Sequence, residues 1–295
     1  MKTLRNPYNT TAPTTAMARI PFGISRFDEL IDGGAPSGSS VLLSGQLGAG
    51  AREFCYTSAT MSALALADRE LFELYYGTLD EEVGMLPDEV HYVSCCMPPR
   101  AVETELGYVL EDDIIETAID SINFLDLSDQ YFKRSRVPME WYSEATPDID
   151  SLGEIRGSRG VLGLLGDYLS EHARDNLIVI DSLTDMVISA DETMSWTDII
   201  VLMKGLSAAA HRWDGLILML VNNEVLSETE VAGLMNAAHG NIVFEWETGG
   251  NERTRTMYVK QFRGVLSRLE DEDIIRFETD IYDHGFDITG VRRIR

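Results

Sequence analysis

The feature that most constrains this chain is a short apolar run that leads into a glycine-rich loop and then into a helical pattern. The apolar run is residues 41–44, and the helical pattern covers about residues 52–66. A buried strand, a glycine turn and a helix N-terminus together form a cradle whose backbone N–H groups can hold phosphate oxygens. The candidate nucleotide-binding residues of this loop are Gly45, Gln46, Leu47, Gly48, Ala49, Gly50, Ala51 and Arg52.

Short apolar runs alternate with amphipathic helical patterns along most of the chain. Strands are predicted at residues 90–94, 122–125, 177–180 and 216–221, and helices at 161–173 and 196–212. Such alternation indicates a parallel sheet covered by helices on both faces. The end of the chain predicts two antiparallel hairpins instead, with strands at residues 241–247, 253–262, 274–279 and 286–289.

No linker rich in Pro, Gly or Ser divides the chain, so we expect one domain over residues 19–295. Residues 1–18 predict a disordered tail in which Met17 is an alternative start. Ser25 and Asp28 have the spacing of a capping box at a helix start. Residues 133–160 predict a long loop excursion, and loops of that length are often functional.

The glycine loop departs from the usual pattern G-x-x-x-x-G-K-[ST] at its last two positions. Gly45 and Gly50 have the expected spacing, but Ala51 and Arg52 stand where Lys and Ser or Thr are expected. The Lys would reach the β- and γ-phosphates, and the hydroxyl would hold Mg²⁺. Alanine does neither, and a guanidinium cannot bind a cation. The glycine backbone alone would still bind a phosphate, but more weakly.

Asp181 directly follows the apolar strand predicted at residues 177–180. A carboxylate at this position holds Mg²⁺ in phosphate-loop proteins. Many ordinary strands end in Asp, so an apolar strand followed by Asp181 is weak evidence by itself. The evidence for a metal-binding carboxylate comes from the order and spacing of this strand relative to the glycine loop. Asp181 is the candidate metal-binding residue.

Three segments resemble KaiC-like ATPases of the RecA superfamily. They are residues 20–38, with a Gly-Gly-x-Pro-x-Gly sequence, residues 180–183, and residues 255–264, with Lys260 and Arg263 in a Lys-x-x-Arg-Gly sequence. The resemblance covers roughly residues 19–289. It implies an α/β fold with a RecA-like P-loop NTPase core, whose mainly parallel sheet is flanked by helices and extended by a C-terminal antiparallel hairpin. ATP and Mg²⁺ are the cofactors it implies, bound weakly here.

The resemblance also implies roles outside the loop. Lys260 and Arg263 would reach the γ-phosphate of a nucleotide on a neighbouring subunit of a homo-oligomer; alternatively they lie on an exposed antiparallel strand. Asn222 and Asn223 match the position of the family's polar sensor, or are turn residues.

The family's catalytic base ends the strand that follows the first helix. Cys96 and Met97 stand where its carboxylates should fall, and neither serves as that base at neutral pH. Glu103 and Glu105 are alternatives, although they look like exposed helix residues. Since the phosphate lysine, the Mg²⁺ hydroxyl and the base are all missing, we expect no catalytic residues and little or no ATP hydrolysis.

The formal net charge of −25, with only four Lys among 24 basic residues, resembles proteins of halophilic archaea. The loop variant at residues 48–54 is similar to a halophilic subset labelled HTR-like. This charge disfavours nucleic acid as a partner.

No apolar run approaches the length of a membrane span. Three Cys cannot form a disulfide framework, which suits the cytoplasm, and the scattered His predict no zinc site.

These observations favour a regulatory or scaffold protein with a degenerate nucleotide site, which acts through an unknown protein partner in signalling. One alternative is an active ATPase in which Arg52, Lys260 and Arg263 supply the charge. Another is an accessory factor in DNA recombination or repair, because relatives in this superfamily handle DNA.

Overall fold

A computed structural model describes residues 18–79, 84–133, 135–142, 160–190, 194–249 and 252–293. The predicted tail, with the alternative start at Met17, lies outside the described residues except for Ala18. Most of the long excursion predicted over residues 133–160 also lies outside them.

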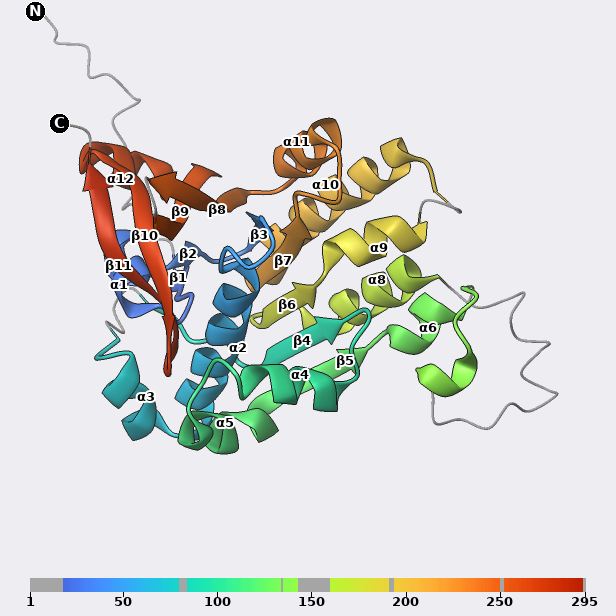
Figure 1. Ribbon diagram of the computed structural model, residues 1–295, viewed down its shortest axis with the longest axis horizontal. Coiled ribbons are helices and arrows are strands. Elements are labelled where there is room, and N and C mark those ends of the chain that lie inside the picture. The colour runs from blue at the N-terminus through green and yellow to red at the C-terminus, as the bar shows by residue number, and fades with distance from the viewer. Residues whose placement is uncertain are drawn as a thin grey trace, which may run out of the picture.

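A nine-stranded sheet runs through the described structure in the order β11-β10-β9-β8-β3-β7-β6-β4-β5 (Figure 1). The strands are β3 (Ser39–Gly45), β4 (Val90–Ser94), β5 (Ile122–Asp126), β6 (Leu177–Asp181), β7 (Leu216–Asn222), β8 (Gly240–Gly249), β9 (Glu252–Phe262), β10 (Ile274–Tyr282) and β11 (Gly285–Arg293). The part from β8 to β5 is parallel. The part from β8 to β11 is antiparallel.

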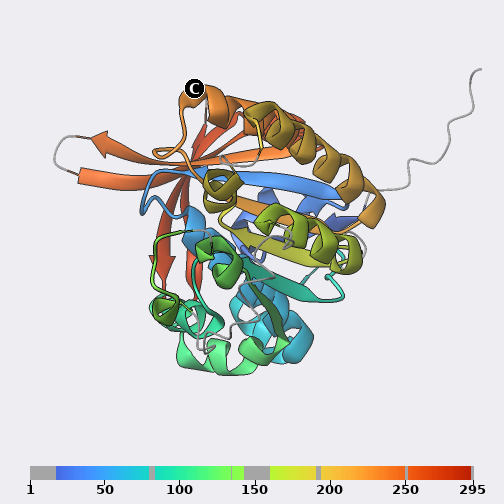
Figure 2. The same cartoon turned by 90° about the vertical axis from the view of Figure 1, so that its right-hand side faces the viewer.

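Helices cover both faces of this sheet (Figures 1 and 2). They are α1 (Ser25–Leu30), α2 (Ala51–Ala67), α3 (Arg69–Tyr75), α4 (Pro99–Leu106), α5 (Asp112–Ala118), α6 (Ser128–Phe132), α8 (Val161–His172), α9 (Leu183–Ala190), α10 (Trp196–Trp213), α11 (Glu228–Ala237) and α12 (Leu266–Asp271), with short 3-10 turns η1 (Ile119–Ser121) and η2 (Met139–Trp141). A small separate sheet pairs β1 (Arg19–Ile20) with β2 (Ala35–Pro36). None of the helices in the described ranges is long and apolar enough to span a bilayer.

The central strands bury side chains on both of their faces. In β3, Val41 and Leu43 pack into a core with α1 to α5, whereas Leu42 packs into a second core with α8 to α11. Successive side chains of a strand point to opposite faces, so both must be apolar when helices cover both sides. This is why the parallel strands are continuous apolar runs in the sequence.

The predicted fold class is confirmed by this architecture. The predicted parallel strands correspond to β3, β4, β5, β6 and β7, and the two predicted hairpins correspond to β8–β9 and β10–β11. Strand β8 has a double role, because it also pairs in parallel with β3. The C-terminal hairpins therefore continue the same sheet that carries the glycine loop.

The predicted capping box at Ser25 and Asp28 was wrong. Ile24 is the N-cap of α1, and no side chain caps that helix. The buried carboxylate of Asp28 instead accepts hydrogen bonds from the backbone N–H of Phe22 (2.8 Å) and Ile24 (3.2 Å), and from the phenol of Tyr76 (3.1 Å). Burial raises the pKa of Asp28 to about 7, against the opposing effect of these hydrogen bonds.

Phe54 anchors the first turns of α2 in the core. Its ring centroid lies 5.5 Å from that of Phe22, 5.5 Å from that of Phe244 in β8, and 5.4 Å from that of Phe286 in β11. Its side chain is fully buried. One aromatic residue therefore joins the chain start and the C-terminal strands to the helix that follows the glycine loop.

We expect Phe54→Ala to lower the free energy of unfolding by about 3–5 kcal/mol, because it leaves a cavity among these rings. The control Leu74→Ala removes an apolar side chain that is 75% exposed on α3, and it should cost less than about 0.5 kcal/mol. Urea unfolding in concentrated KCl measures both. Equal losses in the two variants would contradict the central packing role of Phe54.

Candidate functional site

The glycine loop lies between β3 and α2, at the carboxyl edge of the parallel strands (Figure 1). Gly48 and Gly50 have φ angles of 72° and 108°, a region that favours glycine. A Cβ atom at Gly50 would also lie only 2.8 Å from a ring carbon of Phe286. Because α2 has 17 residues, its N-terminus presents a substantial positive dipole to the loop. The backbone thus retains the features of a phosphate cradle.

Strands β8 and β9 hold the outer side of the loop. The indole Nε1–H of Trp246 donates to the carbonyl of Leu47 at 3.0 Å, and the backbone N–H of Trp246 donates to Gln46 Oε1 at 2.8 Å. Arg255 Nε–H donates to the carbonyl of Gly48 at 3.0 Å. These bonds use loop carbonyls and the Gln46 side chain. The amides of Gln46 and Ala49 are also used, since they donate to the carbonyls of Phe244 at 3.2 Å and of Gln46 at 3.0 Å.

A carboxylate contacts one amide of the loop. Glu224, in the turn after β7, accepts a hydrogen bond from the N–H of Leu47 at 3.0 Å. On the same side, the guanidinium groups of Arg253 and Arg255 lie 4.0 and 4.7 Å from the ring of Trp246. The loop therefore has a carboxylate on one amide and two guanidinium groups at its rim, of which that of Arg255 is also paired with Asp280 at 3.3 Å.

Asp181 ends β6 beside the start of α2, and both its carboxylate oxygens have partners. Arg52 Nη2 lies 3.1 Å from Oδ1, and the phenol of Tyr92 in β4 donates to Oδ2 at 2.7 Å. The Asp181 side chain is only 2% exposed. Burial lowers the pKa of Arg52, but the charge of Asp181 outweighs it and raises that pKa above its usual value. Burial, followed by the charge of Asp181, raises the pKa of Tyr92 far above its usual range, so the phenol remains a donor.

These residues do not fit a Mg²⁺ ion in this arrangement. Asp181 already faces two hydrogen-bond donors, and the Arg52 guanidinium lies where a cation would have to bind its Oδ1. Ala51 and Arg52 supply no oxygen ligand. Metal binding by Asp181 stays a prediction that requires Arg52 to move away.

The position expected for the catalytic base carries thiols. Cys95 is buried, and its backbone N–H donates to the carbonyl of Asp181 at 3.0 Å. Cys96 is half-buried, and burial raises its pKa to about 12, so it is a thiol at neutral pH. The alternatives Glu103 and Glu105 are exposed on α4. The stretch after β4 thus offers no thiolate for base catalysis.

Lys260 and Arg263 do not approach the glycine loop of their own chain. Both are exposed, and neighbouring Phe262 pairs with Gly240 at the start of β8. Gly240 pairs with Val41, at the opposite end of β3 from the loop. A contact with a nucleotide on a neighbouring subunit stays a prediction.

Asn222 and Asn223 make turn contacts next to the loop. Asn222 Oδ1 accepts from the N–H of Glu224 at 2.9 Å, and the N–H of Asn223 donates to the carbonyl of Gly45 at 3.1 Å. These contacts agree with the interpretation of Asn223 as a turn residue, whereas Asn222 is the last residue of β7 and its side chain accepts a hydrogen bond from the turn.

Sequence reasoning missed several residues that build this site. Tyr92, Glu224, Trp246 and Arg255 were not singled out, because each lies far along the chain from the residue it contacts. Trp246 and Arg255 lie in predicted strands, and a strand pattern does not distinguish a residue that contacts the loop from any other exposed residue. The one available signal was that Arg255 begins the segment at residues 255–264 that resembles the family's hairpin, and that Trp246 lies nine residues before it.

Comparison with known proteins places the fold. No protein-family model matches the chain, and no curated protein matches its sequence. The structure is similar to that of a KaiC-like protein from the hyperthermophilic archaeon Pyrococcus horikoshii OT3, with a TM-score of 0.59 and 18% sequence identity. The match covers 93% of this chain and 100% of that one. At this identity the likeness shows the fold, which is a RecA-like α/β core.

The ion pair of Arg52 and Asp181 gives a stability prediction. We expect Arg52→Gln to lower the free energy of unfolding by about 1–3 kcal/mol, because it leaves a buried carboxylate without its counter-charge. Arg52→Gln combined with Asp181→Asn should recover part of the loss, with a coupling energy above about 0.5 kcal/mol.

The matched control is Arg69→Gln, which removes the exposed pair with Glu73 on α3. That change should cost less than about 1 kcal/mol. Urea unfolding of the four variants and the wild type gives the coupling energy. Strictly additive effects of Arg52→Gln and Asp181→Asn would contradict the pairing.

Proposed function

We propose that this protein is a regulatory or scaffold protein built on a RecA-like, KaiC-like fold with a degenerate nucleotide site. It hydrolyses ATP weakly or not at all, and it acts through protein contacts in signalling. The observation that carries the proposal is the ion pair between Arg52 and Asp181, because an arginine fixed on that carboxylate takes the place of the cation that phosphoryl transfer needs.

The remaining groups of the site support anion binding without a metal. The glycine backbone and the N-terminus of α2 supply N–H donors and a dipole, and the guanidinium of Arg255, which is also paired with Asp280 at 3.3 Å, lies beside Gly48. Such a site favours a phosphate group electrostatically. None of these groups orients or deprotonates an attacking water. The site therefore suits a bound nucleotide that acts as an effector, not as a substrate.

The active-ATPase alternative needs the charge of Arg52 to face the phosphates. In the structure this charge is neutralised by Asp181 at 3.1 Å, which favours the regulatory proposal. The DNA accessory alternative gains no support from the site, and the net charge of −25 opposes a polyanionic partner.

The face around the loop supports a protein contact, including self-association into a homo-oligomer. Leu47 at the tip of the loop is 76% exposed, and Val225 beside Glu224 is 55% exposed. Exposed apolar side chains next to a cationic rim are typical of interaction surfaces.

All three cysteines are free thiols, which is consistent with a cytoplasmic location. The continuous sheet from β5 to β11 supports treating residues 19–295 as one domain.

Calorimetry with ATP in concentrated KCl tests the nucleotide part of the proposal. We expect the wild type to bind ATP weakly and with the same affinity with and without Mg²⁺, because Arg52 occupies the metal position. The matched variant Ala51→Lys/Arg52→Thr restores both missing groups. It should bind at least about tenfold more tightly with Mg²⁺ than without it.

A phosphate-release assay on the same two proteins separates binding from turnover. Neither protein should show sustained hydrolysis, since both carry Cys96 and Met97 at the position expected for the catalytic base. Sustained turnover by the wild type at a rate of about 1 s⁻¹ or more, the range of ordinary enzymes, would overturn the proposal.

A further inference from the structure

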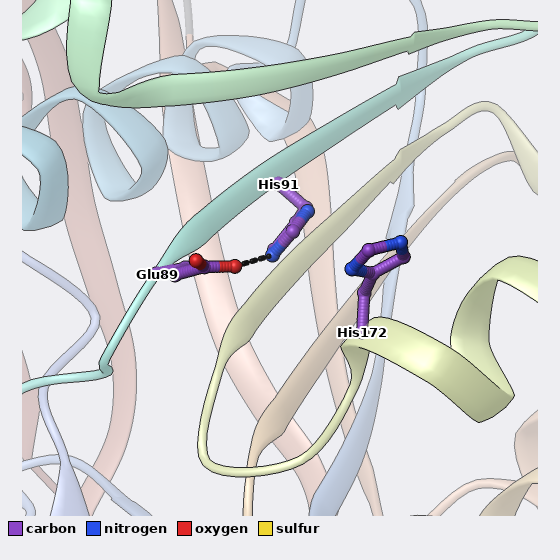
Figure 3. Close-up of side chains that lie close together, drawn as sticks. All are labelled: Glu89, His91 and His172. Atoms are coloured by element: carbon purple, nitrogen blue, oxygen red, sulfur yellow. Dashed lines mark hydrogen bonds and ion pairs between the residues drawn. The ribbon is translucent and has the colours of Figure 1, made fainter.

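Three side chains of metal-ligand type meet at the amino edge of the sheet. Glu89 directly precedes β4, His91 lies in β4, and His172 ends α8 (Figure 3). Each offers one ligand atom, and these atoms all lie within 4.8 Å of one another. The two histidines are far apart in the sequence, so only the packing of α8 against β4 brings them together.

The ring of His91 is buried and held at both nitrogens. Nε2 lies 3.0 Å from Glu89 Oε2, and Nδ1 lies 2.7 Å from the hydroxyl of Tyr168, one turn before His172 in α8. In metal sites, a histidine ligand uses one nitrogen for the metal and the other for an oriented hydrogen bond. Tyr168 provides that second contact: with a metal on Nε2, Nδ1 carries the proton and donates it to the phenol oxygen.

Asn176 ties together the backbone segments that carry the ligands. Its Oδ1 accepts from the N–H of Glu89 at 2.9 Å, and its Nδ2 donates to the carbonyl of His172 at 2.8 Å. The rings of His91 and His172 lie with centroids 5.3 Å apart. Asn176 Nδ2 also lies 3.3 Å from His91 Nε2, a contact that a metal on Nε2 would replace. Asn176 therefore positions the segments that carry the ligands without a metal.

We propose that Glu89, His91 and His172 bind a divalent transition-metal ion of the Zn²⁺ class. Two imidazole nitrogens and one carboxylate oxygen suit Zn²⁺ and its neighbours, and they disfavour Mg²⁺ and Ca²⁺, which prefer oxygen ligands alone. Glu89 and His172 are partly exposed, with 55% and 35% of their side chains accessible, so an ion can enter. Bound metal joins the C-terminus of α8 to the start of β4.

This site is independent of the nucleotide site. His91 pairs with Ile178, three residues before Asp181 along β6. At about 3.3 Å per residue, the two sites lie roughly 10 Å apart along the strands, towards opposite edges of the sheet. The two sites share no ligand residue, so Zn²⁺ binding is tested in the absence of nucleotide.

Equilibrium dialysis of tag-free protein against ZnCl₂, followed by elemental analysis, tests the proposal. We expect one equivalent of Zn²⁺ per chain and a rise in melting temperature that a chelator reverses. His172→Asn should abolish stoichiometric binding. Tyr168→Phe should weaken it about 10–100-fold, because it removes only the hydrogen bond to Nδ1. His284→Asn, the same change at a partly exposed histidine of the C-terminal hairpin, should bind like the wild type.

His172→Asn and Tyr168→Phe change partly exposed side chains, and circular dichroism checks that both variants fold. Co²⁺ serves as a second probe, with visible absorption bands of four- or five-coordinate cobalt expected in the wild type and lost in His172→Asn. The proposal is overturned if the wild type retains less than half an equivalent of Zn²⁺, or if folded His172→Asn binds it as tightly as the wild type.

Discussion

The candidate nucleotide site of this molecule depends on the contact between Arg52 and Asp181. The carboxylate ends a buried strand, the guanidinium begins the helix after the glycine loop, and Tyr92 completes the partners of the acid. A buried carboxylate needs such partners, because an unpaired charge in the interior is costly. In a phosphate-loop NTPase a metal ion and its waters fulfil that need. Here the guanidinium of Arg52, a cation that belongs to the chain itself, fulfils that need. The buried carboxylate of Asp181 therefore requires no metal ion as a partner.

The surrounding sheet keeps the loop in place despite this change. Trp246 and Arg255 hold loop carbonyls from β8 and β9, and Phe54 packs against Phe286 of β11. Loop geometry and hydrolytic chemistry are thus separable: the first depends on backbone and packing, the second on a few side chains. A chain can lack the hydrolytic side chains and keep the loop geometry, which is the physical basis of the regulatory role proposed above.

Most of the fold and part of the site could be predicted from the sequence. Strands such as β3 and β6 were found because burial on both faces requires continuous apolar runs, and the missing lysine and hydroxyl followed from the spacing of Gly45 and Gly50. The partner of Arg52 could not be predicted, because a long side chain can turn towards solvent, phosphate or Asp181. The capping box failed because burial drew Asp28 towards Phe22 and Ile24. The cluster at His91 depends on which helix covers β4, which local patterns do not encode.

Anomalous diffraction from crystals grown with Mn²⁺ and a non-hydrolysable ATP analogue tests the central claim most directly, since Mn²⁺ scatters where Mg²⁺ would bind. The account predicts that Arg52 stays paired with Asp181 and that no manganese peak lies within bonding distance of the Asp181 carboxylate. A manganese ion bound to Asp181, with the Arg52 guanidinium displaced, would contradict it.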